Sequence, residues 1–406
     1  MSIVKKVCFI ATSDAQGIER YRLFNPMWAI KDLGVEVVQL PIELTDEFAL
    51  PDLLKSYAME LREADFLVIC SPINYSVFNK FNELVKAINA VRIFPNTLKL
   101  IADYDDDLFN IAPYNTAYNY YGTKEYNIKQ DDDTMLPLWK NGMVYGETEF
   151  NTTKNEQHLE DIRRIMRMCS GITTTTERLG AVIRQNNPNV YVCPNAVDTN
   201  MWNLELPEKP EHDPSRIRVI MSGGNSHGAD FGSIRKGLAK VMKDHPEVDL
   251  IFMGQKYGTK RDIPPSRITH IPFAADYDEY VVNMLLSGAD IGICPLTDEE
   301  FNYSKSPIKW IEYGALGIPA VVAETMYGDH VQDNVNALVY DNSELHREHS
   351  FYTKLTSLVE DINLRKSIGT AAKTRVEKVY SLVEQGRTYL SILEQIKDPK
   401  HSIVRF

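Results

Sequence analysis

Short runs of apolar residues alternate with segments of helical periodicity along most of the chain. The runs have the length of strands, and few polar residues interrupt them. They lie at 7–12, 35–40, 65–70, 98–103, 171–176 and 190–195 in the first half of the chain, and at 216–224, 248–254, 268–274, 291–296 and 318–324 in the second. Because near-continuous apolar strands between helices are typical of parallel sheets covered on both faces, the pattern predicts an α/β fold.

A segment rich in proline and charge, residues 204–215, separates the two series of strands. Since strand and helix alternate in each series, we predict two doubly wound, Rossmann-like domains that face each other across a cleft. The N-terminal domain covers 1–203 and the C-terminal domain covers 216–380. Ligands of such sheets bind beyond the carboxyl ends of the strands, so functional residues are expected there.

The composition is that of an ordinary globular protein, with 44% hydrophobic and 25% charged residues. The net charge of −12 disfavours broad electrostatic binding of nucleic acid but allows a local basic groove. No apolar run reaches membrane-spanning length, and residues 1–15 lack the apolar core of a signal peptide. The five cysteines show no CxxC spacing, which favours buried, reduced thiols. We therefore expect a cytoplasmic protein without membrane insertion, of unknown oligomeric state.

Residues 105–154 follow neither the helical nor the strand period and are rich in Asp, Asn and Tyr. An insertion this long inside a compact domain is more often functional than not. Asp105, Asp106 and Asp107 are contiguous, whereas sites for hard cations space their carboxylates more widely, so we expect no metal there. The run is compatible with a solvated loop. Alternatively, one aspartate faces the cleft and orients an acceptor hydroxyl, and we choose Asp106 for this role.

Two cations lie at the start of a helix predicted late in the second series. Ser306 is a suitable N-cap and Pro307 suits the first helical position, so the helix should begin there. A helix N-terminus normally prefers acidic side chains, yet Lys305 and Lys309 both point to this end. A bound phosphate would explain this placement. The alternative is an i, i+3 ion pair between Lys309 and Glu312 on a solvated helix, worth roughly a few tenths of a kcal/mol.

The same stretch resembles the glycosyltransferases of family 4, retaining enzymes of the two-domain GT-B architecture that use nucleotide-sugar donors. That family carries two glutamates eight positions apart, then a small residue and Gly-x-Pro, and the second half is present as Glu312-Tyr313-Gly314-Ala315-Leu316-Gly317-Ile318-Pro319. The first glutamate would fall at Ser304, so its role beside the transferred sugar has no counterpart here. Lys305 and Lys309 resemble a Lys-Ser-x-x-Lys subset of the family. Weaker counterparts occur at 103–109, 174–179, 192–202 and 288–296.

The resemblance implies a donor site around this helix. Glu312 would hold the ribose hydroxyls, while Ser306 and its neighbours, including Pro307, would donate backbone N–H groups to the diphosphate. In the family, the loop after the first strand approaches the sugar and phosphates from the N-terminal domain. Here that loop contains Gly17, Arg20 and Arg22, with Arg20 the catalytic candidate. The alternative is a solvated loop with a helix cap.

The Gly-rich loop after strand 216–224 offers one more donor-binding side chain, His227, although a plain surface histidine is the open alternative. Lys236 resembles the phosphate-binding Lys-Gly of the family. It lies too few residues before Gly254 for a helix, a turn and a strand to follow, so we place it on a solvated helix face.

The resemblance also assigns the acceptor to the N-terminal domain. Asp105 and Asp107 would contribute beside the catalytic Asp106, and Tyr118 and Tyr121 are candidate platforms for a sugar or base because aromatic faces suit both. In this architecture the segment 381–406, whose apolar residues recur at helical spacing, packs back on the first domain. Transfer in the family is metal-independent.

The resulting hypothesis is a retaining glycosyltransferase that needs no cofactor beyond a nucleoside-diphosphate sugar, with a UDP-sugar favoured. Lys309 would stabilise the leaving diphosphate, and a carbohydrate or small-molecule hydroxyl is favoured over DNA as acceptor. One alternative is a phage-type glycosyltransferase that modifies a hydroxylated nucleobase in DNA. A sugar-nucleotide epimerase of the same fold would need an acid/base pair that the sequence does not suggest. A non-catalytic sugar-nucleotide binder is the remaining possibility, given the missing glutamate.

Overall fold

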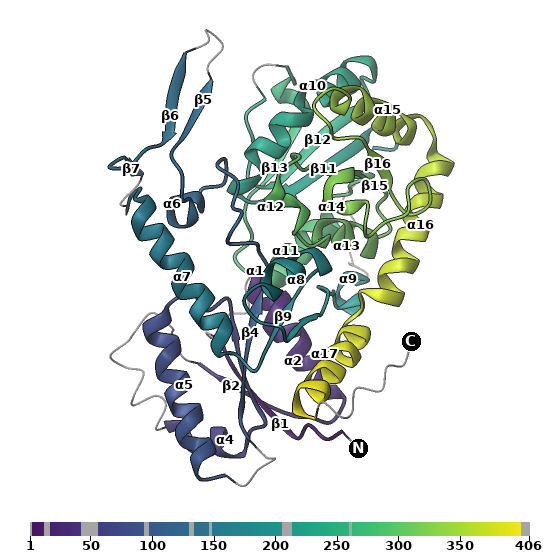
Figure 1. The fold of residues 1–406 in the computed structure, drawn as a ribbon. Helices are drawn as coiled ribbons and strands as arrows, with labels where there is room; N and C mark the ends of the chain where they lie inside the picture. The colour runs from purple at the N-terminus through teal and green to yellow at the C-terminus, as the bar shows by residue number, and fades with distance from the viewer. Residues whose placement is uncertain are drawn as a thin grey trace. The chain divides into compact units, whose positions relative to one another are not determined.

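The computed structural model describes residues 2–11, 17–41, 56–92, 97–129, 134–145, 148–204, 213–259 and 262–398. The chain forms two compact units, seen as ribbons in Figure 1. Unit 1 consists of Met1–Pro113, Ala117–Asn195 and Val383–Phe406, and unit 2 of Tyr114–Thr116 and Ala196–Leu382. Each unit holds a six-stranded sheet within the described residues, so the predicted class of two doubly wound α/β domains is confirmed. Most of the expected linker, 205–212, lies outside the described residues.

The sheet of unit 1 is parallel, with the strand order β10-β9-β4-β3-β1-β2. Its strands are β1 (Lys6–Ile10), β2 (Glu36–Leu40), β3 (Phe66–Cys70), β4 (Lys99–Tyr104), β9 (Gly171–Thr174) and β10 (Val190–Val192). All six coincide with predicted apolar runs. The order reverses between β1 and β3, where a doubly wound sheet opens a crevice at its carboxyl edge.

Helices cover both faces of this sheet, because successive strand residues point to opposite sides. Leu67 and Ile69 pack with the helices α5 and α7, which lie side by side in Figure 1, whereas Phe66 and Val68 pack with α2 and α17. The helical elements of unit 1 are α1 (Gly17–Glu19), the π-helical turn η1 (Arg20–Phe24), α2 (Asn25–Asp32), α4 (Ala58–Glu63), α5 (Tyr75–Ala90), α6 (Tyr118–Tyr121), α7 (Thr152–Met168), α8 (Glu177–Arg184) and α17 (Leu382–Lys397).

The last described helix, α17, packs in unit 1 although it follows unit 2 in the sequence. Tyr389, Ile392, Leu393 and Ile396 are buried in the same apolar cluster as β1 and α2. A side chain on Gly386 would meet the backbone of Ala29 at 3.0 Å, so glycine permits close contact of the two helices. The expected return of the C-terminal helix to the first domain is confirmed.

The insertion after β4 forms small elements of its own. Two hairpins, β5 (Tyr126–Lys129) with β6 (Met135–Trp139) and β7 (Val144–Tyr145) with β8 (Thr148–Glu149), follow the short helix α6. The first hairpin stands out from the rest of unit 1 (Figure 1). Met135 and Leu136 on it are exposed. The local pairing explains why this stretch showed no long period.

The sheet of unit 2 is also parallel, in the order β13-β12-β11-β14-β15-β16. Its strands are β11 (Ile217–Gly223), β12 (Val248–Gly254), β13 (Ile268–Ile271), β14 (Ile291–Cys294), β15 (Ala320–Ala323) and β16 (Leu338–Tyr340). The sequence pattern predicted the first five and missed the short β16. Here the strand order reverses between β11 and β14.

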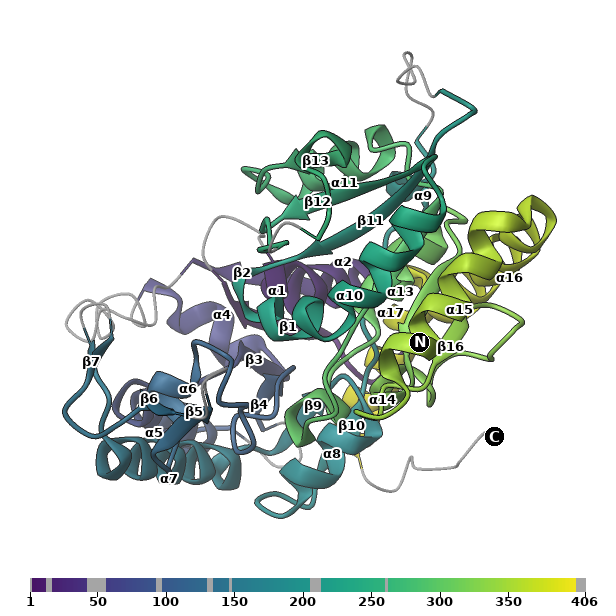
Figure 2. The same ribbon diagram turned by 90° about the horizontal axis from the view of Figure 1, so that it is seen from above.

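Helices pack on both faces of this second sheet as well. Phe231 of α10 packs on Phe252 of β12, and α10 runs along these strands in Figure 2. Tyr313 of α13 packs against Gly292 on the other face. The helical elements of unit 2 are α9 (Thr199–Trp202), η2 (Asn225–His227), α10 (Gly228–Asp244), η3 (Pro265–Arg267), α11 (Tyr277–Leu286), α12 (Glu300–Tyr303), α13 (Ile308–Ala315), α14 (Glu324–Tyr327), α15 (Arg347–Glu360) and α16 (Ile362–Val379).

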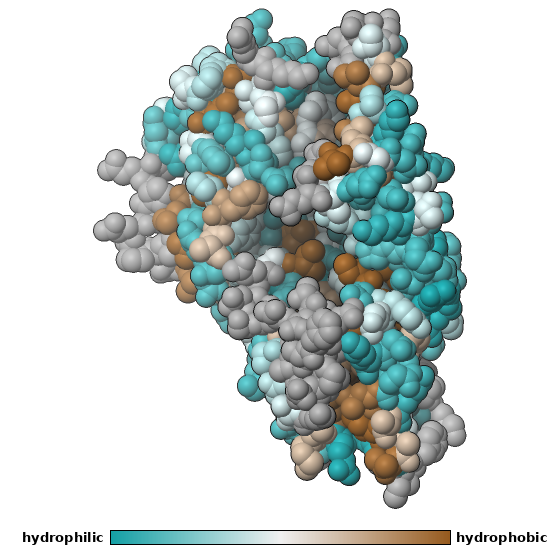
Figure 3. Space-filling model, turned by 90° about the vertical axis from the view of Figure 1, so that its left-hand side faces the viewer, coloured by the Kyte–Doolittle hydropathy of each residue, from teal (hydrophilic) through white to brown (hydrophobic). Residues whose placement is uncertain are grey.

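The surface carries both hydrophobic and hydrophilic residues. On the face shown in Figure 3, small hydrophobic groups lie between hydrophilic ones. Among the helices that the structure describes, none combines the length and the apolar character needed to cross a membrane.

Candidate functional site

The reversal between β11 and β14 brings two loops together at the carboxyl edge of the unit 2 sheet. One loop leaves Gly223 and enters α10 through His227, and the other leaves Cys294 and enters α13 through Lys305. Doubly wound sheets bind their ligands at this position, because neighbouring strands there send their connections to opposite faces. The predicted donor-binding residues on both loops therefore lie at the same edge of the sheet.

The helix α13 begins one residue later than the sequence suggested. Its first residue is Ile308 and its N-cap position is Pro307, which makes no side-chain cap. The predicted N-cap, Ser306, stands outside the helix, so this prediction was wrong. The reason is local: α12 ends at Tyr303 with Ser304 as its buried C-cap, and the chain needs the intervening residues to turn. The helix ends at Ala315 with Leu316 as its C-cap, and Gly317 follows at φ +70°.

Lys309 makes the ion pair that the sequence left as an alternative. Its Nζ donates to Glu312 Oε2 at 2.9 Å and lies 3.0 Å from the hydroxyl of Tyr280, which itself donates to Glu312 at 2.6 Å. The pair is not on a solvated face, since Glu312 is only 1% exposed. Burial alone would lower the pKa of Lys309, but the charge of Glu312 raises it on balance. The ammonium is thus charged and fixed at the first turn of α13.

Two aromatic residues near this pair were not foreseen. Tyr280 comes from α11, and burial followed by the charge of Glu312 raises its pKa. Tyr313 accepts from the backbone N–H of Ser222 at 2.9 Å and so joins α13 to the end of β11. Tyr280 lies in no distinctive sequence pattern, and the motif that contains Tyr313 gave it no role. Only the fold brings Tyr280 to Glu312 and Tyr313 to Ser222.

Asp230 joins the two loops of this edge. Its carboxylate lies 2.8 Å from His227 Nδ1 and accepts from the backbone N–H of Thr297 at 2.8 Å. Asn302 donates to the same carboxylate at 3.4 Å. Burial alone would raise the pKa of Asp230, but its hydrogen bonds with His227 and the charge of Lys305 lower it on balance. The His-x-x-Asp spacing at the start of a helix is the sequence signal for this residue, which was not among the predicted site residues.

His227 has a defined hydrogen-bonding state in this arrangement. Burial, followed by the charge of Lys305, lowers the pKa of the imidazole, so the ring is neutral near pH 7. Because the carboxylate of Asp230 only accepts, Nδ1 carries the proton and Nε2 is an acceptor. The ring also passes close to Gly223, where an added Cβ would lie 3.0 Å from His227 Cδ2 and from the hydroxyl of Tyr257.

Lys305 completes the cationic side of the loop. Its Nζ lies 4.9 Å from the centre of the Phe301 ring, and its charge lowers the pKa of His227. Lys236, by contrast, lies in the middle of α10 with 69% of its side chain exposed, as the spacing argument predicted. The unit 2 edge therefore gathers Lys305, Lys309, His227 and Glu312.

Arg22 of unit 1, a predicted donor-binding residue, is buried. Arg22 is 2% exposed, and its Nε and Nη2 donate to both carboxylate oxygens of Asp103 at 2.9 and 2.7 Å. Its Nη1 donates to Cys193 O and to Asn195 Oδ1. Arg22 is thus a buried support that joins β4 to the end of β10, and the structure does not place it as a donor-binding group.

Gly17 and Arg20 lie at the entry to the helical turn before α2. Gly17 has φ +53° and Arg20 donates from Nε to Asn25 Oδ1 at 3.2 Å. The guanidinium of Arg20 stacks over Trp28, 4.5 Å from the ring centre. The rest of the predicted loop, 12–16, falls outside the described residues.

The three aspartates after β4 have different surroundings. Asp107 is buried and accepts from the N–H of Phe109 and the amide of Asn110, so it shapes the turn and does not face an acceptor. Asp105 and Asp106 are half-buried. Burial, followed by the charges of Asp106 and Asp103, raises the pKa of Asp105 to about 8. For Asp105 and Asp106 the acceptor role stays a prediction.

The two candidate tyrosines of the insertion also differ. Tyr118 is buried against Phe150 and Trp139, and its hydroxyl donates to Lys124 O, so it belongs to the core of the insertion. Tyr121 is half-buried and stacks on His158 at 5.3 Å. Burial, followed by the charge of Asp106, raises the pKa of Tyr121. Tyr121 therefore lies near Asp106, whereas Tyr118 does not serve as a platform.

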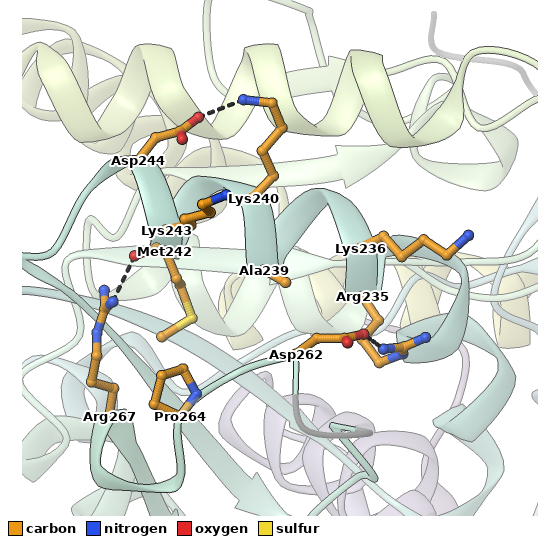
Figure 4. Close-up of a pocket in the computed structure, with 10 residues that line it drawn as sticks. All are labelled: Arg235, Lys236, Ala239, Lys240, Met242, Lys243, Asp244, Asp262, Pro264 and Arg267. Atoms are coloured by element: carbon orange, nitrogen blue, oxygen red, sulfur yellow. Dashed lines mark hydrogen bonds and ion pairs between the residues drawn. The ribbon is translucent and has the colours of Figure 1, made fainter.

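The described residues contain no group of three or more His, Cys, Asp or Glu side chains that could hold a metal ion. A large cavity of about 840 Å³ lies away from the site, along the C-terminal half of α10 (Figure 4). Two of the cations that line it are paired locally, Lys240 with Asp244 and Arg235 with Asp262, while Arg267 donates to Met242 O. Since Lys236 and Lys243 also line the groove, its lining carries a net positive charge.

No protein-family model matches the sequence, and no curated protein does. Solved structures resemble the fold along almost the whole chain. A glycosyltransferase from Rickettsia africae has 11% identity and a TM-score of 0.60 over 98% of this chain and 99% of its own. Anabaena HepE, in complex with UDP and glucose, has 12% identity and a TM-score of 0.57 over 98% and 100%. An α-glucosyltransferase bound to UDP and a 13-mer DNA with an HMU base has 13% identity and a TM-score of 0.60 over 96% and 99%. The chain therefore has the GT-B fold of these enzymes.

The buried ion pair of unit 1 gives a test of its structural role. Replacing Arg22 by Met leaves the Asp103 carboxylate buried without its guanidinium, which should lower the free energy of unfolding by about 3–5 kcal/mol. Arg20→Met is the matched control and should cost about 1 kcal/mol or less, because it removes a half-exposed cation stacked on Trp28 and its hydrogen bond to Asn25. Urea denaturation followed by circular dichroism measures both. Equal stabilities of the two variants would contradict the assignment.

Proposed function

We propose that the chain is a retaining glycosyltransferase that moves a sugar from a nucleoside-diphosphate sugar, UDP-sugar being favoured, to a hydroxyl acceptor. The observation that carries the proposal is the gathering of Lys305, Lys309, His227 and Glu312 at the strand-order reversal of unit 2. Two cations and a helix start suit a diphosphate, and a buried carboxylate suits the hydroxyls of a ribose. The shared fold with sugar-transferring enzymes supports the same reading.

The donor would lie along the first turn of α13. Lys305 and Lys309 bind the phosphate oxygens together with backbone N–H groups near Ser306 and Pro307. The carboxylate of Glu312, already held by Lys309 and Tyr280, accepts from the ribose hydroxyls. His227 Nε2 accepts from a hydroxyl of the donor sugar, since its Nδ1 is taken by Asp230.

The reaction breaks the bond between the anomeric carbon and a phosphate oxygen. Negative charge builds up on the leaving diphosphate, and cations that are fixed in advance stabilise it without reorganising. The network of Glu312 and Tyr280 provides this fixation for Lys309. The sugar passes through an oxocarbenium-like state, and the acceptor hydroxyl takes the place that water has in hydrolysis. Retention and metal independence follow from the resemblance to family 4.

The acceptor would bind at the aspartate loop of unit 1. We assign Asp106 to orient the acceptor hydroxyl and Asp105 to receive its proton. The raised pKa of Asp105 suits a proton acceptor. A general base works best when its pKa lies near the working pH, because enough of it is then deprotonated and it still binds the proton strongly. Arg20 is assigned to the phosphates from the same unit.

DNA as acceptor is the second candidate, since one structural relative is bound to DNA. The net charge of −12 favours a small acceptor instead. An epimerase would need an acid/base pair on the donor sugar. His227 is held by Asp230 with its pKa lowered, which suits a hydrogen-bond acceptor better than an acid.

A donor screen followed by product analysis tests the function. Thermal shifts with nucleoside diphosphates and their sugars should single out one base, and the matching donor should yield a glycoside with retained configuration by NMR. Activity should survive EDTA. With a small acceptor the rate should change little between two salt concentrations, whereas a DNA acceptor predicts steep inhibition as counterions are released. Donor turnover to an epimer without any acceptor product would contradict the proposal.

The role of Lys309 can be separated from its structural ion pair. Lys309→Ala should weaken UDP binding by about 10- to 100-fold, as expected for a hydrogen bond to a charged group, and uridine binding far less. Lys236→Ala, an exposed lysine of α10, is the control and should bind both ligands as the wild type does. Calorimetry measures both affinities. An equal loss for UDP and uridine would instead assign Lys309 a purely structural role.

The aspartate pair predicts a particular pH profile. Because the pKa of Asp105 is raised to about 8, the carboxyl is protonated below that pH and transfer should rise as pH increases through it. Asp105→Asn should remove this limb, and Asp106→Asn should lower transfer strongly while UDP affinity stays nearly unchanged. Steady-state rates between pH 6 and pH 10 (roughly two units on either side of the pKa) check this. Wild-type rates and profiles in both variants would remove these residues from the acceptor site.

A further inference from the structure

A separate cavity of about 410 Å³ opens in unit 1 between the end of β3 and the start of α5. Its walls are formed by Ile69 of the strand and by Val77, Phe78 and Phe81 of the helix, and Pro72 and Ile73 lie on the connecting loop. The described residues that line it carry no charge. Its size falls within the range of about 300–1,000 Å³ that small-molecule pockets usually have.

The cavity stands at the second strand-order reversal of the molecule. In the unit 1 sheet the order reverses between β1 and β3, and the cavity follows β3 at the carboxyl edge. Ligands bind to doubly wound sheets at this position. The neighbouring strand β4 is in register, with Cys70 opposite Asp103, so the loop that carries Asp105 and Asp106 leaves the same edge.

The loop at the mouth of the cavity, residues 71–74, has an uncommon backbone conformation that hydrogen bonds hold in place. Ser71 has φ +42°, which is uncommon for a residue other than glycine, and its N–H donates to Asp103 O at 2.7 Å. The hydroxyl of Tyr104 donates to Pro72 O at 2.8 Å, and Asn74 caps α5 through Val77 N. Such strained positions persist where the surroundings fix them, and they gather at ligand sites.

The rim of the cavity combines polar and apolar groups. Ser71 and Asn74 offer a hydroxyl and an amide, and Ile73 exposes 39% of its surface. The interior has no cation for a phosphate and few partners for sugar hydroxyls, so a polar group placed inside it would lose hydrogen bonds to water. An apolar ring or branched alkyl group would lose none.

We propose that this cavity binds an apolar group of the acceptor, so that the acceptor class is a hydroxyl compound with an aromatic or branched alkyl part. The apolar group lies against Val77, Phe78 and Phe81, and the reacting hydroxyl extends to Asp105 and Asp106 on the neighbouring loop. The inference rests on the proposed glycosyl transfer and names its acceptor. A free sugar or a DNA strand would leave the cavity unused.

A pair of matched probes tests the cavity directly. Phenyl β-D-glucopyranoside and methyl β-D-glucopyranoside share their hydroxyls and differ in the apolar group. In saturation-transfer NMR with the UDP-bound wild type, the phenyl protons should receive saturation, and the phenyl compound should bind at least tenfold more tightly than the methyl compound. Equal affinities, or no transfer to the phenyl ring, would overturn the inference.

Two variants locate the binding. Val77→Phe fills the cavity and should reduce the phenyl compound to the level of the methyl compound, whereas Val91→Phe, the same change at an exposed position that follows α5, should bind as the wild type does. Ile73→Ser, at the rim, should weaken phenyl binding severalfold and tests the inference even where Val77→Phe fails to fold. Unchanged phenyl binding in a folded Val77→Phe or Ile73→Ser protein would place the probe elsewhere and overturn the inference.

The acceptor assignment and the proposed glycosyl transfer can be refuted independently of each other. UDP binding to the wild type, measured by calorimetry, reports on the proposed function alone. Loss of the phenyl preference with UDP binding intact overturns only the acceptor assignment, and absence of UDP binding overturns the function beneath it.

Discussion

The carboxylate of Asp230 joins the two loops on which the candidate donor site depends. Strands β11 and β14 send their chains to opposite faces of the sheet, so nothing in the strand pairing itself keeps their following loops together. Asp230 does so by binding His227 from one loop and Thr297 and Asn302 from the other. The resulting geometry sets the tautomer of the imidazole and positions the loop that carries Lys305. A buried carboxylate with this many partners is costly to replace, because each donor would be left without an acceptor.

A buried carboxylate also explains the position of Lys309. A lysine near a helix N-terminus is unfavourable by itself, since the helix dipole and the ammonium repel each other. The buried Glu312 one turn later compensates this, and Tyr280 adds a neutral donor to the same carboxylate. The ion pair and the anion site are therefore not competing interpretations. The carboxylate keeps the cation charged and immobile, and an immobile cation stabilises a leaving group without reorganisation.

Much of the fold could be predicted from the sequence because apolar strands of parallel sheets differ plainly from amphipathic helices. The strands β1 and β11 appeared as uninterrupted apolar runs, whereas β16 was too short to stand out. The site was only partly predictable. Glu312 and its lysines were found through a motif, but Tyr280 comes from another helix and reaches Glu312 only in the folded chain. Arg22 lay in the predicted loop, yet its partner Asp103 is far away in sequence, so its burial could not be foreseen.

We assign the nucleoside diphosphate to the strand-order reversal of unit 2, and a crystal structure of the protein with UDP would show whether it binds there. This assignment predicts phosphate oxygens within about 2.7–3.2 Å of Lys309 Nζ or Lys305 Nζ, with the ribose on Glu312. A diphosphate bound in the groove of Figure 4, or one without contact to the start of α13, would contradict it.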